Sequence, residues 1–431
     1  MEQRPAATAA QPRPAGAGSA LPPPAPAPVI SCPDCATLQR LPAPRRGAQL
    51  RCRCCGRRFS SAVPASSDTA LALLLAALLL WAPACLAPLM SVEAGGAVRT
   101  TGLAGCVQAL WAAGYAPLAV LVGALMILVP SAYLGLLTLV LLRLRIGATP
   151  HARWPAHLLR LTGELQPWLM LEVFLIGGCV AYTRMQSVAE VSLGLAGWCL
   201  LGCSLLLLGT GAVLDRRALW RALPAPAAVP ARAPRNALAC SHCELLLAPA
   251  AAYCPRCGAR AAARKAHALQ RTTALVLTGL LLYIPANLLP VISIERYGVA
   301  TASTILGGVR ELIQSGLWLL AAIVFTASVV VPLVKLGSLA ALLWFTARGS
   351  AGFLPGRTRV YRVVDAIGRW SNIDVFMISL LVALVQFGAL SHVKVESGAV
   401  AFAAVVVITM LAARTFDPRV MWDRGAGRAA A

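Results

Sequence analysis

Long apolar runs separated by short charged segments dominate the hydropathy pattern of this chain. A helix needs about 20 mostly apolar residues to cross the hydrocarbon core of a bilayer. Eight runs come near that length, at roughly 69–90, 114–142, 166–183, 191–214, 272–294, 316–346, 374–391 and 398–413. The pattern predicts eight transmembrane helices, of which the third and the last are the weakest because they are short or interrupted by charge.

The connections between these runs alternate in charge. Arginines gather between the second and third runs, after the fourth, between the sixth and seventh, and after the eighth. Basic loops stay in the cytoplasm. Both termini are therefore predicted to be cytoplasmic, and the poorly basic connections face the opposite side, around 91–113, 184–190, 295–315 and 392–397.

The composition supports a membrane protein. Of 431 residues, 58% are hydrophobic and 13% are charged, which is too little polar surface for a soluble core of this size. The net charge of +22 suits basic cytoplasmic loops better than nucleic-acid binding, so we expect no nucleic-acid partner. Residues 1–31 are rich in Pro and Ala, lack the pattern of a signal peptide and are expected to form a disordered tail.

The chain contains an internal repeat with a constant spacing of 202 residues. Matching residues include Pro83 and Pro285, Pro88 and Pro290, Gly105 and Gly307, Gly114 and Gly316, Pro130 and Pro332, Trp168 and Trp370, Phe174 and Phe376, Asp215 and Asp417, and Trp220 and Trp422. Coincidence on this scale indicates duplication. Because four spans is an even number, both copies enter the membrane in the same direction, as parallel repeats.

The second copy is the more polar one. It has Asn287, Lys335, Ser371, Asn372 and Asp374 where the first copy has Cys85, Tyr133, Leu169, Met170 and Glu172. This difference predicts that the second copy carries the working site and that the first is a scaffold or a partner wall.

A four-cysteine motif precedes each membrane block. The first contains Cys32, Cys35, Cys52 and Cys55, and the second contains Cys240, Cys243, Cys254 and Cys257. Paired CxxC knuckles followed by glycine are typical of closed tetrahedral zinc sites, which fold segments too small to hold a core. We predict two structural Zn²⁺ sites; a redox dithiol or an iron site is the alternative, and Cys54 competes with Cys52 or Cys55 as a ligand.

These features divide the chain into a disordered tail, two zinc ribbons, two membrane domains, a linker and a C-terminal tail. The predicted boundaries, in that sequence along the chain, are 1–31 for the tail, 32–60 for ribbon 1, 69–220 for membrane domain 1, 221–239 for the linker, 240–260 for ribbon 2, 271–423 for membrane domain 2 and 424–431 for the C-terminal tail.

Lys335 lies deep in the sixth span, too far from the helix end to reach cytoplasmic water easily. Asp374 is its best candidate partner, and backbone carbonyls or a water-filled cavity are the alternatives. Lys335, Asp374, Asn287 and Ser371 are predicted to border a polar site that binds a headgroup or a proton; the competing interpretation is an ion pair that only fixes packing. Pro285, Asn287 and Pro290 should break the fifth span, and Pro130 and Pro332 should bend the second and sixth.

No catalytic constellation is evident. The chain has five histidines, no HExxH, GxSxG or phosphate-loop motif, and few, scattered carboxylates. We therefore expect no catalytic residues and no enzyme activity.

Several segments of the second copy resemble one known family. They are LYIPANLLPVISI at 282–294, STILGGVREL at 303–312, IVFTASVVVPLVKL at 323–336, RWSNIDVF at 369–376 and FDPRVMW at 416–422. Together with the paired ribbons, they resemble the paraquat-inducible protein A family of Gram-negative inner-membrane proteins. The first copy departs from the motif at Cys85 and Ala87, which puts a polar function there in doubt.

The resemblance implies a multi-pass protein of the bacterial inner membrane that passes phospholipid to a periplasmic MCE-domain protein. Two other classes stay open: a proton- or ion-coupled small-molecule transporter or stress-protective membrane factor, and a redox membrane protein that uses the CxxC pairs.

Overall fold

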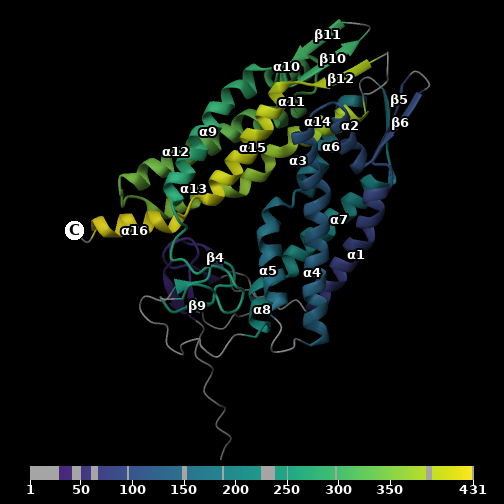
Figure 1. The fold of residues 1–431 in the computed structure, drawn as a ribbon. Coiled ribbons are helices and arrows are strands. Elements are labelled where there is room, and N and C mark those ends of the chain that lie inside the picture. The colour runs from purple at the N-terminus through teal and green to yellow at the C-terminus, as the bar shows by residue number, and fades with distance from the viewer. Residues whose placement is uncertain are drawn as a thin grey trace, which may run out of the picture.

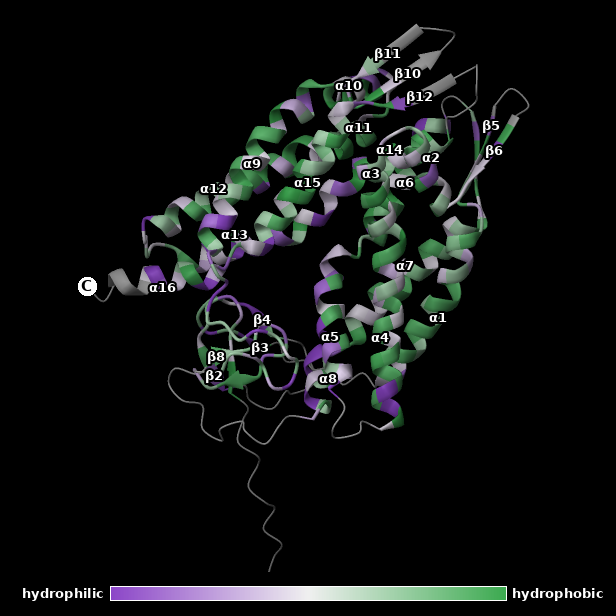
Figure 2. Cartoon of the chain, in the orientation of Figure 1, coloured by the Kyte–Doolittle hydropathy of each residue, from purple (hydrophilic) through white to green (hydrophobic). Residues whose placement is uncertain are grey.

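The computed structural model describes residues 29–40, 50–59, 67–94, 97–147, 153–186, 189–224, 238–249, 251–296, 299–384 and 391–429. Eight of the helical segments described are long and apolar enough to cross a membrane, which confirms the predicted number. They are Ser67–Leu86, Ala116–Ile146, Trp154–Gln186, Leu195–Val213, Ala268–Leu288, Trp318–Ala347, Leu354–Leu384 and Ser397–Thr415. Most of their residues are hydrophobic (Figure 2), as expected of helices surrounded by lipid. The tail predicted over 1–31 lies outside the described residues up to position 28.

The two repeats contain the same elements in the same order (Figure 1). The first consists of α1 (Ser67–Leu86), β5 (Met90–Ala94), β6 (Ala97–Thr101), α2 (Leu103–Ala112), α3 (Ala116–Gly123), the π-helix η1 (Ala124–Leu128), α4 (Val129–Ile146), α5 (Trp154–Leu165), the 3-10 helix η2 (Gln166–Trp168), α6 (Leu171–Gln186), β7 (Glu190–Leu193), α7 (Leu195–Val213) and α8 (Arg216–Ala222). The second consists of α9 (Ala268–Leu288), β10 (Ile292–Arg296), β11 (Val299–Ser303), α10 (Ile305–Gln314), α11 (Trp318–Phe325), the π-helix η3 (Thr326–Val330), α12 (Val331–Ala347), α13 (Leu354–Ile367), the 3-10 helix η4 (Gly368–Asn372), α14 (Ile373–Leu384), β12 (Ser391–Val395), α15 (Ser397–Thr415) and α16 (Pro418–Ala429).

A small β-ribbon precedes each repeat. Ribbon 1, residues 29–59, contains the antiparallel pairs β1 (Val29–Ser31) with β2 (Leu38–Arg40) and β3 (Leu50–Arg51) with β4 (Arg58–Phe59). Ribbon 2, residues 238–261, contains β8 (Leu238–Ala239) paired with β9 (Leu246–Leu247), and a single bridge between Tyr253 and Arg260. Both ribbons lie at one end of the helix bundle, which we call the ribbon end (Figure 1).

A three-stranded antiparallel sheet from each repeat lies at the opposite end, the sheet end (Figure 1). The strand orders are β6-β5-β7 and β11-β10-β12. The helix predicted over 272–294 is therefore wrong in its last residues, because α9 ends at Leu288 and Ile292 begins a strand. Proline disfavours the helical conformation of the residue before it, so Pro290 ends the helix, and the β-branched residues after it favour a strand.

Proline acts differently at three predicted disruptions. Pro285 does not break its helix: α9 continues to Leu288, and the amide of Leu289 caps the carbonyl of Pro285 at 2.9 Å. Pro130 and Pro332 each follow a π-helical turn, η1 and η3, where the sequence predicts a bend. A proline cannot donate to the carbonyl one turn back, and a π turn is a common way for the backbone to accommodate such a fault.

The repeats meet across α6 and α14, where equivalent residues contact each other. The rings of Phe174 and Phe376 pack edge to face with centroids 5.7 Å apart. The amide of Asn372 lies 2.9 Å from the sulfur of its equivalent, Met170. Contact between residues at the same position of two copies is the mark of a two-fold axis. A pseudo-two-fold axis therefore passes between α6 and α14, in agreement with the predicted parallel repeats.

Replacement of Gly177 by leucine should force α6 away from α14. A Cβ at Gly177 would lie 3.0 Å from the carbonyl oxygen of Ile373 and 3.3 Å from Cβ of Phe376. Overpacking of this kind typically costs about 1–3 kcal/mol, so the detergent-solubilised variant should unfold at a lower temperature than the parent. Gly135→Leu is the matched control, because a Cβ there has no neighbour within 4 Å. Equal losses in both variants would contradict a tight seam.

Candidate functional site

Two groups of four buried cysteines could each hold a metal ion. In ribbon 1 they are Cys32, Cys35, Cys52 and Cys55, and in ribbon 2 they are Cys240, Cys243, Cys254 and Cys257, with all sulfurs of a group within 4.8 Å of one another. The S···S separation is 3.5 Å from Cys32 to Cys55, from Cys240 to Cys257 and from Cys243 to Cys254. Cys54 is half-buried and is not a member of the ribbon 1 group.

Each knuckle turns on a residue with a left-handed backbone. Gly56 and Gly258 follow the second knuckles with φ of +69° and +68°, as the sequence predicts. Ala36 and Glu244 hold the same conformation after the first knuckles, with φ of 60° and 58°. The backbone amides at these positions donate to the carbonyls of the first cysteine in each knuckle, which brings the paired thiols together.

The crowded thiols share protons. Hydrogen bonds from Cys32 and Cys55 lower the pKa of Cys35 to about 3. The hydrogen bond to Cys243 lowers the pKa of Cys240 to about 7, while the pKa of Cys243 is raised. Hydrogen bonds from Cys240, Cys243 and Cys257 also lower the pKa of Cys254. Ionised sulfurs in each group are thus stabilised by neighbouring thiols, whereas four ionised sulfurs at this distance need a cation.

Within the membrane repeats, Lys335 on α12 is fully enclosed by protein. Its ammonium donates to the hydroxyl of Thr409 on α15 at 2.9 Å and to the carbonyl of Gly368 in η4 at 3.4 Å. The backbone carbonyl that the sequence offers as an alternative partner is therefore present. Both hydrogen-bond acceptors of this ammonium are neutral groups, and the carboxylate of Asp365 on α13 lies close enough to interact with it electrostatically.

Asp374, at the start of α14, is also buried and belongs to a different contact. Its Oδ2 accepts a hydrogen bond from the hydroxyl of Ser328 in η3. The guanidinium of Arg184, on α6 of the first repeat, lies close enough to interact with this carboxyl electrostatically.

The predicted ion pair between Lys335 and Asp374 is therefore wrong. Ser328 and Lys335 lie seven residues apart on the continuous helix η3–α12, which separates them by about 10 Å along the axis. Asp374 bonds to Ser328, so the two charges lie at different depths. The sequence predicts that Lys335 and Asp374 lie in the same half of the bilayer, but it does not give their depth to within one helical turn.

Three buried oxygens near this site have no hydrogen-bond partner among the described residues. They are Oγ of Ser371, Oδ1 of Asn372 and Oδ1 of Asp374, all within η4 and the first turn of α14. Leaving a buried polar group unpaired costs about 1–3 kcal/mol. Such a cluster points to water or the polar group of a bound molecule as the missing partner.

Asn287, the fourth predicted residue, does not join this group. Its side-chain amide donates to the carbonyl of Tyr283 in its own helix at 2.8 Å. Tyr283 in turn donates to the carbonyl of Val329, next to Ser328, at 3.4 Å. The structure thus brings Lys335, Ser371 and Asp374 around η4 and leaves Asn287 on the neighbouring helix α9.

Ser328 and Thr409 are site residues that the sequence prediction missed. The signal was present in the repeat, because the equivalent positions in the first copy are the apolar Met126 and Leu207. Serine and threonine are common in membrane helices, since their hydroxyls bond to the carbonyl one turn back. Thr409 does so here at Val406, and Ser328 Oγ lies 2.6 Å from the carbonyl oxygen of Val324 as well as beside Asp374.

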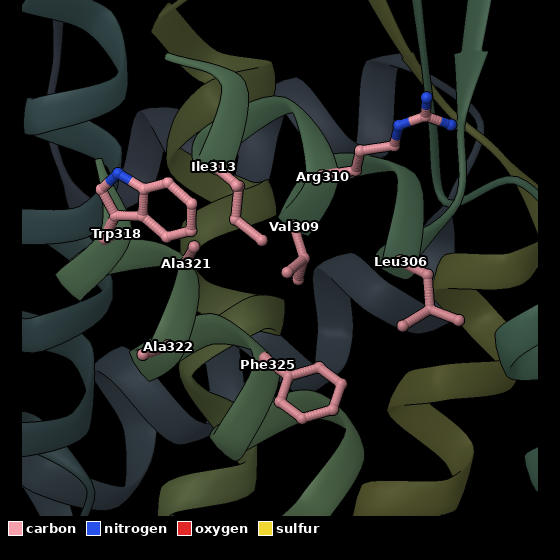
Figure 3. Close-up of a pocket in the computed structure, with 8 residues that line it drawn as sticks. All are labelled: Leu306, Val309, Arg310, Ile313, Trp318, Ala321, Ala322 and Phe325. Carbon is pink, nitrogen blue, oxygen red and sulfur yellow. The ribbon is translucent and has the colours of Figure 1, made fainter. Parts of the chain in front are cut away.

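An apolar groove of about 440 Å³ lies between α10 and α11, near the sheet end. Figure 3 shows Val309, Ile313, Trp318 and Phe325 around the same space, while the guanidinium of Arg310 extends away from it beside a strand. The groove is lined by Leu306, Val309, Arg310, Ile313, Trp318, Ala321, Ala322 and Phe325. Because α11 continues directly into η3, the groove lies on the same helical axis as Ser328.

Comparisons with known proteins match the repeats. A sequence model of the family described as paraquat-inducible protein A matches residues 68–224 and 269–425. The chain is 35% identical over 405 residues to the intermembrane transport protein PqiA of Escherichia coli strain K12, with 92% of this chain and 95% of that protein covered.

Two further relatives are more distant. The chain is 32% identical over 266 residues to lipophilic envelope-spanning tunnel protein A of the same strain, covering 60% of this chain and 61% of that protein. It is 27% identical over 276 residues to a probable intermembrane transport protein of Haemophilus influenzae, covering 62% and 66%. No solved structure matches the chain.

Removal of one sulfur from either group should remove one metal ion. We expect elemental analysis of the purified protein to find two ions per chain in the parent, one in Cys52→Ser and one in Cys254→Ser, because each group offers four ligands to one ion. Cys54→Ser is the control and should keep both ions. Loss of an ion from Cys54→Ser would make Cys54 a ligand.

Proposed function

The chain belongs to the paraquat-inducible protein A family, and we propose that it is the inner-membrane component of an MCE-type intermembrane phospholipid transport system. In this role it passes lipid between the inner membrane and a conduit formed by a periplasmic MCE-domain protein. The names of two relatives, an intermembrane transport protein and an envelope-spanning tunnel protein, support transport rather than catalysis.

The observation that carries this proposal is the series of sites along one helical axis. The apolar groove on α10 and α11 comes first, the Ser328–Asp374 contact follows at η3, and Lys335 with Thr409 lies two turns further on. An apolar groove suits an acyl chain, and buried charges with unpaired oxygens suit a headgroup or a transferred proton. Lys335, Asp374 and Ser371 are the residues of this polar site, with Asn287 beside it.

The ribbon end is cytoplasmic in this proposal and the sheet end is periplasmic. Arginines concentrate near the ribbon end, including Arg143, Arg145 and Arg216, as expected of loops retained in the cytoplasm. Both termini are then cytoplasmic, and the two sheets lie on the periplasmic side, where they face the MCE-domain partner.

The metal of both ribbons is zinc. Sulfur atoms 2.3 Å from a tetrahedral ion lie about 3.8 Å apart, and the closest pairs here lie 3.5–3.6 Å apart. With four sulfurs and no open position, each ion supplies folding energy to its ribbon and takes no part in transport chemistry. The domain boundaries predicted from the sequence, 32–60 and 240–260 for the ribbons and 69–220 and 271–423 for the membrane domains, follow this division.

A proton- or ion-coupled transporter is the second candidate. The unpaired oxygens beside Asp374 favour it, because buried ionisable groups with room for water are typical of proton relays. To separate the two candidates, the tagged protein is extracted gently from its native membrane and its copurifying proteins and lipids are identified by mass spectrometry. An MCE-domain protein with phospholipid supports lipid transport; intact protein with neither supports the self-contained transporter.

Neutralising Asp374 should impair transport without unfolding the protein. Asp374→Asn keeps the size of the side chain and its contact with Ser328, so we expect at least a tenfold loss of labelled phospholipid transfer from proteoliposomes at unchanged yield of folded protein. Glu172→Gln, the equivalent change in the first repeat, should transfer lipid like the parent. If Asp374→Asn instead depletes the folded protein, Asp374 serves packing rather than transport.

A further inference from the structure

Each ribbon contacts the repeat that does not follow it in the chain, and ribbon 1 also contacts the repeat that follows it, where the guanidinium of Arg217 on α8 lies 5.0 Å over the ring of Phe59. Ribbon 1 precedes the first repeat but contacts α13 and α16 of the second, through Arg362 and Trp422. Ribbon 2 precedes the second repeat but contacts α5 and α8 of the first, through Arg160 and Arg217. Figure 1 shows both ribbons between the ends of these helices.

The two crossed contacts use equivalent residues. Arg160 on α5 and Arg362 on α13 are 202 residues apart. Arg362 donates to the carbonyl of Cys55 at 2.9 Å, and Arg160 donates to the carbonyl of Cys257 at 3.4 Å. These are the fourth cysteines of their groups, so the pseudo-two-fold arrangement of the repeats extends to the ribbons.

In ribbon 1 the contact reaches the sulfur itself. Arg362 Nη2 also lies 3.2 Å from Sγ of Cys55, and its Nε donates to the buried carboxylate of Asp34 at 2.7 Å. Arg57, within the ribbon, pairs with the other oxygen of Asp34. Four thiolates around a divalent ion carry a net charge of about −2, and a guanidinium that donates to one of them stabilises that charge.

Ribbon 2 is held without such a contact. His242 stands where ribbon 1 has Asp34, and its Nε2 lies 4.0 Å from Glu164 of α5. Arg160 pairs with the same Glu164 at 3.3 Å, and Arg217 makes a two-pronged pair with Glu244 at 2.8 and 2.9 Å. These groups attach the ribbon to α5 and α8, and the contact that Arg160 makes with Cys257 is to its backbone oxygen.

We propose that the ribbons are metal-dependent crossed ties between the two repeats, and that Arg362 is an outer-shell positioning residue of the ribbon 1 metal site. Metal folds each ribbon, and the folded ribbon holds the opposite repeat. The effect is reciprocal. If bound metal strengthens the docking of ribbon 1 on α13 by some factor, docking strengthens metal binding in ribbon 1 by the same factor. The inference rests on the proposed metal content of the ribbons and is independent of lipid transport.

Metal release from the purified, metal-loaded full-length protein tests the role of Arg362. A chromogenic chelator in excess reports the ions as they leave. Loss of an outer-shell partner typically weakens metal binding 10–100-fold, so Arg362→Ala should release one of its two ions at least tenfold faster than the parent. Arg160→Ala, the equivalent change, should alter release less than Arg362→Ala does, because Arg160 contacts the backbone oxygen of Cys257 and not its sulfur. Arg359→Ala, at an exposed neighbouring position on α13, should match the parent.

Hydrogen exchange tests the crossing. Cys52→Ser, which empties ribbon 1, should raise amide exchange in α13 of the second repeat more than in α5. Cys254→Ser, which empties ribbon 2, should do the reverse. If each variant loosens the helix of its own repeat instead, the ties are not crossed.

A negative result in the metal-release or hydrogen-exchange experiment can be distinguished from an error in the metal assignment. Parent protein that carries metal but shows unchanged release in Arg362→Ala overturns the outer-shell role of Arg362. Parent protein that carries no metal overturns the assignment of both sites and the ties with it. Neither outcome changes the phospholipid recovered with the protein, which tests the proposed function separately.

Discussion

The packing of α6 against α14 constrains the rest of the molecule. Phe174 and Phe376 meet edge to face at equivalent positions, and Gly177 leaves room for the carbonyl of Ile373. Aromatic pairs of this kind contribute about 0.5–1.5 kcal/mol beyond the area they bury. Small residues that let membrane helices approach closely matter more in lipid, where the hydrophobic effect does not drive helices together. Once this seam is fixed, the parallel direction of the repeats places both sheets at one end and both ribbons at the other.

A symmetric frame of this kind does not require two equal sites. Ser371, Ser328 and Thr409 have the apolar equivalents Leu169, Met126 and Leu207 in the first repeat, and tyrosine replaces Lys335, whereas Asp374 keeps a carboxylate equivalent in Glu172. The first repeat still reaches the site, because Arg184 on α6 donates to the carbonyl of Gly308 at 3.4 Å and lies 3.7 Å from Glu311. Both acceptors are on α10, which forms one wall of the groove. The first repeat therefore helps to position the groove as well as to support the second.

Much of the architecture could be predicted from the sequence because membrane helices and metal knuckles leave strong local signals. Eight apolar runs, a fixed repeat spacing and four-cysteine motifs gave the number of spans, the parallel repeats and the two metal groups. The sheets were missed because their strands are short and directly follow apolar helices, so a run such as 272–294 contains both. Partner choice was harder: Lys335 and Asp374 were correctly placed as buried, but their separation depends on the helical position of Ser328, which hydropathy does not encode.

The crossed ribbons show a limit of a different kind. Position in the chain suggests that a ribbon serves the repeat it precedes, and no local pattern contradicts this. The contact depends on tertiary structure, in which Arg160 and Arg362 donate to the carbonyls of Cys257 and Cys55. The second repeat holds the ribbon that precedes the first repeat, and the first repeat holds the ribbon that follows it, so a single repeat with only the ribbon before it would leave an arginine and a docking face without their partner. Duplication into one chain keeps both pairs together, and this gives a physical reason for a two-repeat protein in which one repeat holds most of the polar site.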